Sequence, residues 1–403
     1  MNGFMLVGIV GKPNVGKSTF FKAATLAEAE IANYPFVTIK PNEGVAYLKV
    51  PDVAKEFGKT SNPRSGYVLK QFRFIPFKLI DVAGLVPGAH EGKGMGNQFL
   101  DDLRQADVLI HVIDLSGSTN EKGESAALGS YDPAEDVRFL ETELDLWYLG
   151  ILNKGWQKFA RTVIQEKQDI CIALALQLSG LHVTENMVIE AIEELQLNKE
   201  KPHYWQEENL KSLAALLRKK TKPMIIAGNK MDLPPASEKL QSLKQQFPNY
   251  VFIGCSAEGE LALREASKAA LIEYIPGENN FTILKEVNLN EKQKQALSFI
   301  KTAILGRFGQ TGVQQILNAA VFELLRYMAV FPGGANKLED KDGHTLPDCF
   351  LMPPESTALD FAYKIHTDLG QNFIRAIDVR TKRAVGKDHP LKQLDIFEIV
   401  AGR

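Results

Sequence analysis

The feature that most constrains this chain is a glycine-rich stretch near its first residue, "GKPNVGKS", residues 11–18. A short apolar run precedes it, and "STFFKAATLAE", which is rich in helix-forming residues, follows it. Strand, glycine loop and helix in this order are the setting of a phosphate-binding loop, where backbone N–H groups and the helix N-terminus converge on phosphates. The stretch therefore predicts an α/β fold, a P-loop NTPase domain with a parallel-rich sheet.

The side chains and amides of this loop have separate predicted roles. Lys17 reaches the β- and γ-phosphates, and the hydroxyl of Ser18 ligates Mg²⁺. The phosphate cradle predicted from the motif comprises Asn14, Val15, Gly16, Lys17, Ser18 and Thr19.

Two further signals for the γ-phosphate follow along the chain. The apolar run "FKLIDVAGLV" is a predicted strand that contains Asp-x-x-Gly, with Asp81 and Gly84 in the two fixed positions. An aspartate there holds Mg²⁺, and the glycine N–H can meet the γ-phosphate. Between this run and the loop, Thr38 in "YPFVTIKPNEG" is predicted to ligate Mg²⁺ only when a γ-phosphate is present. The alternative for Thr38 is an ordinary strand threonine.

The base is predicted from two later strand ends. "PMIIAGNKMDLP" places Asn229, Lys230 and Asp232 after an apolar run, and "YVFIGCSAEGE" does the same for Ser256 and Ala257. A carboxylate at Asp232 can accept both N1–H and N2–H₂ of guanine, and adenine offers no such pair of donors. The stem of Lys230 would pack along the base plane, and the amides of Ser256 and Ala257 would face the guanine O6. GTP is therefore the predicted substrate and GDP the product.

Composition sets the class of protein. The 403 residues carry a formal net charge of −2, so a nucleic-acid or membrane partner is not indicated by the overall charge. The three cysteines are scattered, which favours a reducing compartment. No apolar run approaches the length of roughly 18 residues that spans a bilayer. A cytoplasmic protein with no membrane partner is the expectation.

The chain is long enough for several domains, and its patterns suggest their limits. A largely helical stretch separates the Asp81 and Asp232 motifs, and a β-β-α-β-β order at the end suggests a small β-grasp fold. The predicted division is a G domain at 1–135 and 222–280, an inserted helical domain at 136–221, connecting helices at 281–328 and a β-grasp domain at 329–403.

The stretch "DVAGLVPGAHEGKGMGNQFLDDLRQADVLIHVID" resembles the Obg branch of the translation-factor-related GTPases. The whole chain resembles the YchF or Obg-like ATPase family in its archaeal form, with a G domain, a helical insertion and a C-terminal TGS (ThrRS–GTPase–SpoT) domain. The resemblance implies a ribosome or RNA contact through the TGS and helical domains. Better-known members replace the guanine-reading aspartate with an Asn-x-x-Glu variant and prefer ATP. This chain keeps Asp232, which favours GTP, and ATP stays as the alternative substrate.

The predicted site departs from Ras-like enzymes at Leu85, where those enzymes use a glutamine to orient the attacking water. Leucine cannot do this, so slow hydrolysis is expected. His90 and Glu91 are candidates to position water, and the alternative is that both are solvated loop residues. Asn14 resembles an asparagine that ligates K⁺ in some related GTPases, with a loop-capping role as the alternative.

Together these signals predict a Mg²⁺-dependent GTP-binding protein and slow GTPase that acts as a nucleotide switch associated with the ribosome or translation. The predicted catalytic residues are Lys17, Thr38, Gly84 and His90, and the predicted Mg²⁺ ligands are Ser18, Thr38 and Asp81. Two alternatives stay open. One is an ATP-hydrolysing Obg-like ATPase, and the other is a non-catalytic, nucleotide-gated protein that binds RNA or the ribosome.

Overall fold

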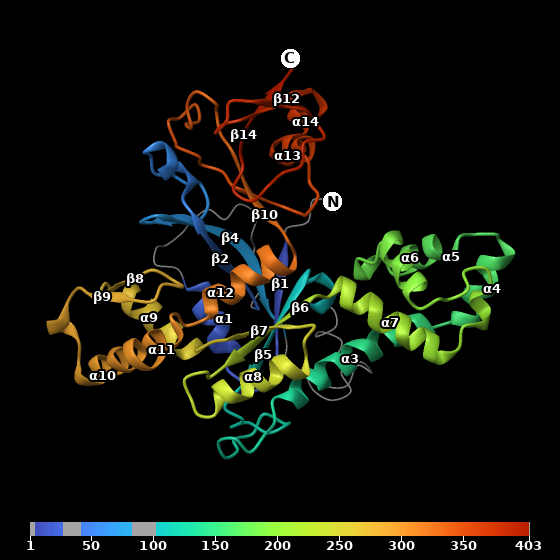
Figure 1. Ribbon diagram of the computed structural model, residues 1–403, viewed down its shortest axis with the longest axis horizontal. Coiled ribbons are helices and arrows are strands. Elements are labelled where there is room, and N and C mark those ends of the chain that lie inside the picture. Colours follow the sequence, from blue (N-terminus) through green and yellow to red (C-terminus); the bar gives the residue numbers. More distant parts are fainter. Residues whose placement is uncertain (1–4, 27–41, 83–101, 403) are drawn as a thin grey trace. The chain divides into compact units, whose positions relative to one another are not determined.

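The computed structural model describes residues 5–26, 42–82 and 102–402 (Figure 1). The chain folds into two compact units. The first unit comprises Met1–Phe21 and Leu79–Glu258, and the second comprises Lys22–Lys78 and Gly259–Arg403.

A parallel sheet forms the centre of the first unit. Its strands follow the order β1, β5, β6, β7, and each neighbouring pair is parallel. The first three strands are buried along their whole length, as expected where helices cover both faces of a parallel sheet. The strands and the helices beside them are β1 (Leu6–Val10), α1 (Lys17–Thr25), β5 (Val108–Asp114), β6 (Met224–Asn229), α8 (Ala236–Gln246), β7 (Val251–Gly254) and α9 (Ala257–Lys268).

A helical region interrupts this sheet between β5 and β6, as the sequence predicts. Its two long helices, α3 and α7, pack along one another (Figure 1). Arg218 of α7 is buried against α3, where its Nε donates to Asp145 Oδ1 at 2.8 Å. No helix in the described part of the chain is long and apolar enough to cross a bilayer. The helices are α3 (Ala134–Asn153), α4 (Trp156–Gln165), α5 (Ile170–Gln177), α6 (Glu185–Glu194) and α7 (Glu207–Thr221).

The second unit ends in a small mixed sheet of order β11, β10, β14, β12, β13, in which β10 and β14 are parallel. Phe361 of α13 is fully buried in the core under this sheet. This arrangement confirms the expected small α/β domain at the end of the chain. Its elements are β10 (Met328–Pro332), β11 (Phe350–Met352), α13 (Ala358–Ile365), α14 (Thr367–Gln371), β12 (Phe373–Asp378), β13 (Ala384–Val385) and β14 (Ile396–Ala401).

The same unit contains elements from the first quarter of the chain and the segment that joins the two sheets. Here β3 and β4 form an antiparallel hairpin, and β4 runs on into the first unit. The helix that begins as α10 runs on through a π-helical turn, Ile300–Leu305, and ends at Phe308 of α11. The elements are β2 (Glu43–Pro51), β3 (Tyr67–Leu69), β4 (Phe72–Asp81), β8 (Ile272–Tyr274), β9 (Phe281–Ile283), α10 (Glu291–Phe299), α11 (Gly306–Phe308) and α12 (Val313–Asn318).

A buried arginine joins the hairpin to the C-terminal sheet within the second unit. Arg73 of β4 is 1% exposed, and its guanidinium donates to the carbonyl oxygens of Leu346 at 2.5 Å and Pro347 at 3.0 Å. The backbone N–H of Arg64 also donates to Pro347 O at 3.0 Å. The loop before β11 is therefore tied to the hairpin by hydrogen bonds that are shielded from water.

Candidate nucleotide site

The glycine loop lies between β1 and α1 in the first unit, and Lys17 is the first residue of α1. Gly16 has a φ of +93°, and a Cβ at this position would lie 2.1 Å from Asn229 Nδ2. Only glycine fits here, because it tolerates the left-handed backbone and leaves room for the amide. The loop is therefore built around a contact with the β6 strand end.

Lys17, where the glycine loop meets α1, is paired with Asp81. The ammonium of Lys17 forms an ion pair with the carboxylate of Asp81, and their side chains are 13% and 20% exposed. Asp81 is the last residue of β4, and Ser18 is exposed at the start of α1. A carboxylate and a hydroxyl near a helix N-terminus are hard oxygen donors that suit Mg²⁺ when phosphates supply the other ligands.

Asn229 joins three parts of the site. Its Nδ2 donates to Val15 O at 2.8 Å, and its Oδ1 accepts from the N–H of Ala257 at 3.0 Å. Its own carbonyl accepts from the N–H of Leu115 at 3.0 Å. The side chain is 4% exposed, so these bonds are protected from water. The Ala257 amide, which the sequence assigns to the base edge, braces Asn229 in this structure.

The two residues that the sequence assigns to the base differ in their partners. Lys230 has a φ of +61°, and its Nζ donates to Asp114 Oδ2 at 2.8 Å. Asp232 is half-buried and its carboxylate has no hydrogen bond or ion pair within the described residues. Ser256 is buried beside Ala257 at the start of α9. The carboxylate of Asp232 is thus open to an external donor.

Asn14 braces the loop instead of standing free. It has a φ of +62°, and its Nδ2 donates to Gly123 O at 2.9 Å. This contact supports the loop-capping alternative from the sequence, and the K⁺ role stays a prediction. Thr38, Gly84, Leu85, His90 and Glu91 lie outside the described residues, so their predicted roles have no structural counterpart here.

Sequence reasoning missed a buried lysine in the same loop. The Nζ of Lys12 lies 2.9 Å from Asp136 Oδ1, donates to Thr119 O at 3.1 Å and sits 3.7 Å from the centroid of the Tyr131 ring. Burial lowers the pKa of Lys12, and the nearby Asp136 carboxylate opposes this shift. No local signal marks Lys12, because its partners come from the segment after β5.

His111, in the middle of β5, is a second buried titratable group near the loop. It is 2% exposed, and its Nδ1 has no hydrogen-bond partner among the described residues. Burial, together with the positive charge of Lys12, lowers the pKa of His111 to about 3. The imidazole is therefore neutral at physiological pH.

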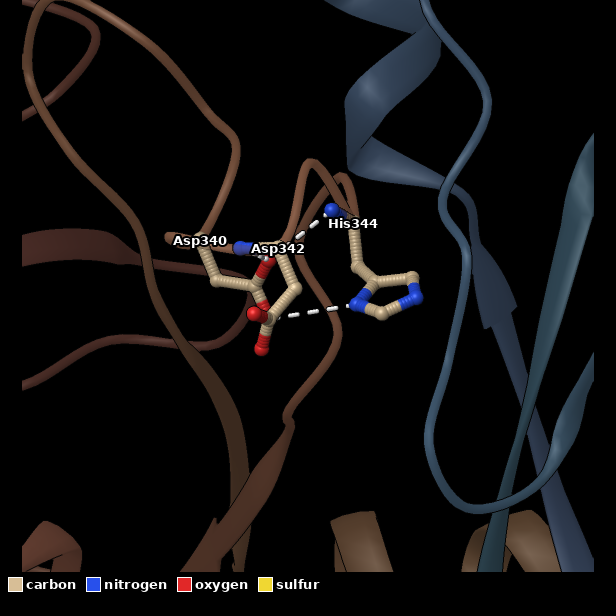
Figure 2. Close-up of side chains that lie close together, drawn as sticks. All are labelled: Asp340, Asp342 and His344. Atoms are coloured by element: carbon tan, nitrogen blue, oxygen red, sulfur yellow. Dashed lines mark hydrogen bonds and ion pairs between the residues drawn. The ribbon is translucent and has the colours of Figure 1, made fainter.

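A separate cluster of potential metal ligands lies in the second unit. Asp340, Asp342 and His344 stand close together in one loop (Figure 2). Asp340 Oδ1 accepts the N–H groups of Asp342 and His344, each at 2.9 Å, and its Oδ2 accepts from Arg64 at 2.5 Å. These hydrogen bonds stabilise the closed conformation of the loop, and we assign no metal ion to the cluster.

Comparison with known protein families matches three parts of the chain. Residues 6–140 match the family described as 50S ribosome-binding GTPase. Residues 227–334 match the G4 motif-containing domain of the Obg-like GTPase YGR210-like family, and residues 341–401 match the TGS domain.

Similar proteins extend over nearly the whole chain. The GTP-binding protein MJ1332 of Methanocaldococcus jannaschii is 50% identical over 98% of this chain and 99% of its own length. The ribosome-binding ATPase YchF of Bacillus subtilis is 29% identical over 92% of this chain and 87% of its own. The crystal structure of a GTP binding protein from Pyrococcus horikoshii superimposes with a TM-score of 0.79 at 41% identity, and covers 99% of this chain and 100% of its own.

Proposed function

This chain belongs to the YchF/Obg-like family of P-loop GTPases, and we propose that it is a Mg²⁺-dependent, slow GTPase that works as a nucleotide switch on the ribosome. The observation that carries the base choice is Asp232, a half-buried carboxylate without a partner in the described residues, next to the braced Asn229. The name of the archaeal relative, a GTP-binding protein, supports the same choice.

The chemistry of the base contact follows from the donors of guanine. An ionised Asp232 accepts N1–H and N2–H₂ together in a charge-assisted, bidentate pair. Adenine presents an acceptor at N1, which would face the carboxylate with no proton between them. A site built to pair polar edges rejects such an analogue by a factor on the order of 10⁴ when the groups are buried. The half-exposure of Asp232 makes the expected factor smaller.

At the phosphate end, this chain's own residues bind and orient the triphosphate. The amides of the glycine loop and the N-terminus of α1 receive the phosphate oxygens. Lys17 would exchange its ion pair with Asp81 for the β- and γ-phosphates, so that Asp81, together with the exposed hydroxyl of Ser18, would be able to hold Mg²⁺. When bound, Mg²⁺ neutralises charge on the β- and γ-oxygens. Thr38 completes the proposed ligand set, and Gly84 and His90 complete the catalytic set.

Slow hydrolysis and the ribosome partner have different support. Leu85 replaces the water-orienting glutamine, so bound GTP persists and the protein stays in one state for long periods. The ribosome contact is supported by the name of the bacterial YchF relatives and by the TGS match. We assign this contact to the TGS and helical domains, in the cytoplasm.

An affinity panel tests the base choice. Fluorescent analogues of GTP, GDP, ATP and XTP would be titrated into wild-type protein and the Asp232→Asn variant, with Mg²⁺ present. We expect wild-type protein to prefer GTP over ATP by at least about 100-fold, and the variant to lose most of its GTP affinity. We also expect the variant to gain affinity for xanthosine nucleotide, whose C2 carbonyl accepts from the new amide. Equal wild-type affinities for GTP and ATP would contradict the role of Asp232.

The second candidate, ATP hydrolysis, is favoured by the bacterial relatives, which are named ribosome-binding ATPases. Turnover of GTP and ATP, each with and without purified ribosomes, separates the candidates. The switch proposal expects slow GTP turnover that ribosomes change. Turnover of ATP alone would favour the second candidate, and binding to ribosomes with no turnover of either nucleotide would favour the non-catalytic alternative.

A further inference from the structure

A buried carboxylate at the end of β5 links the two halves of the nucleotide site. Asp114 is 1% exposed and lies opposite Asn229 in the parallel pairing of β5 with β6. Among the described residues, every donor to its carboxylate comes from the segment just after β5 or from the turn after β6, residues 229–232, which we call the base-reading turn. The donors are the N–H of Ser116 at 2.9 Å, the hydroxyls of Ser116 at 2.5 Å, Ser118 at 2.9 Å and Thr119 at 3.0 Å, and the ammonium of Lys230 at 2.8 Å.

The charge state of Asp114 is set by these donors. Burial acts to raise the pKa of Asp114, but the hydrogen bonds from Lys230 and Ser116 outweigh it and hold the pKa below its ordinary value. The carboxylate is therefore an anion at physiological pH, and its counter-ion is Lys230. Removal of one member of a buried ion pair leaves the other uncompensated.

This pairing restricts Lys230 at both ends. The left-handed backbone of Lys230 fixes where its stem begins, and Asp114 and Ser118 hold its ammonium at 2.8 and 3.2 Å. An unrestrained lysine side chain samples many rotamers, whereas one that is held both at its backbone and at its ammonium keeps a single conformation. Preorganisation of this kind increases affinity because less freedom is lost when the ligand binds.

The same network continues to the phosphate loop. The hydroxyl of Thr119 donates to Asp114 at 3.0 Å, and the carbonyl of Thr119 accepts from Lys12 Nζ at 3.1 Å. Lys12 is paired in turn with Asp136, near the start of α3. A chain of buried polar contacts therefore runs from the base-reading turn to the second residue of the glycine loop.

The close approach of Gly123 to Pro13 is independent evidence that the segment after β5 packs against the glycine loop. Gly123 has a φ of +81°, and a Cβ there would lie 2.6 Å from Pro13 O. The carbonyl of Gly123 accepts from Asn14 Nδ2 at 2.9 Å. The segment after β5 thus touches the glycine loop at Lys12, Pro13 and Asn14, as well as Lys230.

We propose that Asp114 is a positioning residue of the nucleotide site, which holds Lys230 in place for the base. The inference rests on the proposed function only in that the site binds a nucleotide through Lys230. It does not depend on which base Asp232 selects.

A double-mutant cycle tests the proposal. Affinities for GDP and GTP would be measured for wild-type protein, Asp114→Asn, Lys230→Met and the double variant. We expect each single variant to bind both nucleotides at least about tenfold more weakly, and the double variant to match Lys230→Met within about twofold, because contacting residues are not additive. A purely structural role for Asp114 would instead make the two losses multiply.

The control is Asp107→Asn. Asp107 lies just before the other end of β5 and accepts the N–H of Leu6 at 2.8 Å, away from the strand ends that carry the nucleotide motifs. This variant should keep wild-type affinity. Tryptophan fluorescence would show that each variant is folded, since all three tryptophans lie in the first unit.

Three outcomes would overturn the proposal: wild-type affinity in Asp114→Asn, wild-type affinity in Lys230→Met, or multiplied losses in the double variant. If Asp114→Asn does not fold, the double variant, which lacks both charges, is compared with Lys230→Met, and a further loss of affinity refutes the coupling. If wild-type protein binds ATP as tightly as GTP, the base assignment of Asp232 fails. The same cycle run with ATP then still decides the role of Asp114.

Discussion

Substitution of His111 should change how the stability of the first unit depends on pH. The folded state keeps this imidazole neutral down to about pH 3, whereas an unfolded chain protonates it near its ordinary pKa of 6.5. Below pH 6.5 the unfolded state therefore binds more protons, and the free energy of unfolding falls as pH falls. Above pH 6.5 both states are neutral and His111 has no effect on the slope.

The expected size follows from the two pKa values. One pKa unit corresponds to about 1.4 kcal/mol, so His111 alone should remove about 2 kcal/mol of stability between pH 7 and pH 5. Leucine matches the buried surroundings and cannot titrate, so His111→Leu should abolish this part of the acid sensitivity. His182→Gln is the control, because His182 belongs to the same unit and is 54% exposed.

Urea unfolding followed by tryptophan fluorescence measures the effect, since the tryptophans report on the first unit. Wild-type protein and both variants would be unfolded at pH 7, 6 and 5 without nucleotide or Mg²⁺. From pH 7 to pH 5, we expect the free energy of unfolding of wild-type protein and of His182→Gln to fall by the same amount. That of His111→Leu should fall by about 2 kcal/mol less. Parallel pH profiles for wild-type protein and His111→Leu would refute the reasoning. Lys12→Met is a second check, because loss of its charge should raise the pKa of His111 and flatten the profile.

Three further substitutions have defined outcomes. Lys17→Ala should abolish measurable nucleotide binding and leave the circular-dichroism spectrum unchanged, because Lys17 acts on phosphates and is outside the core; near-wild-type affinity would contradict this. Asn229→Ala should lower the free energy of unfolding of the first unit by about 2–4 kcal/mol, because it leaves the buried carbonyl of Val15 and the buried N–H of Ala257 unpaired. Asn120→Ala, whose lost hydrogen bonds are exposed to water, should change this free energy little. Arg73→Met should speed hydrogen exchange of the Arg64 amide, whose acceptor carbonyl loses its second anchor, and unchanged exchange would show that the loop does not depend on the guanidinium.

The local motifs of the nucleotide site were predictable because each is a short run with fixed spacing. The strands that precede the glycine loop, end at Asp81 and end at Asn229 form as predicted, and the parallel pairing of β1, β5 and β6 brings the glycine loop and Asn229 to one edge of the sheet. The contact of Lys17 with Asp81 then follows from the order of the strands. Chemistry of this kind can be read from the sequence because the ligand itself demands the spacing.

The division of the chain was not predictable in the same way. The sequence assigns residues 1–135 and 222–280 to one G domain, whereas the compact units group Lys22–Lys78 with Gly259–Arg403. Arg73 is a reason for this, since its guanidinium is satisfied by carbonyl groups more than 270 positions later in the sequence. An arginine in an apolar strand pattern gives no indication of so distant a partner.

By itself, the sequence predicted a phosphate-binding loop, a Mg²⁺-binding aspartate and a guanine-type carboxylate, because such groups act through residue type and short-range spacing. Only the tertiary structure decided the states of Lys12, His111 and Asp114, which in the sequence are a loop lysine and two polar residues in a strand. Each depends on burial and on partners far away in the chain, such as the 116 positions that separate Asp114 from Lys230. Charge and protonation inside a protein are set by these long-range neighbours and by the exclusion of water, which are properties of the folded chain.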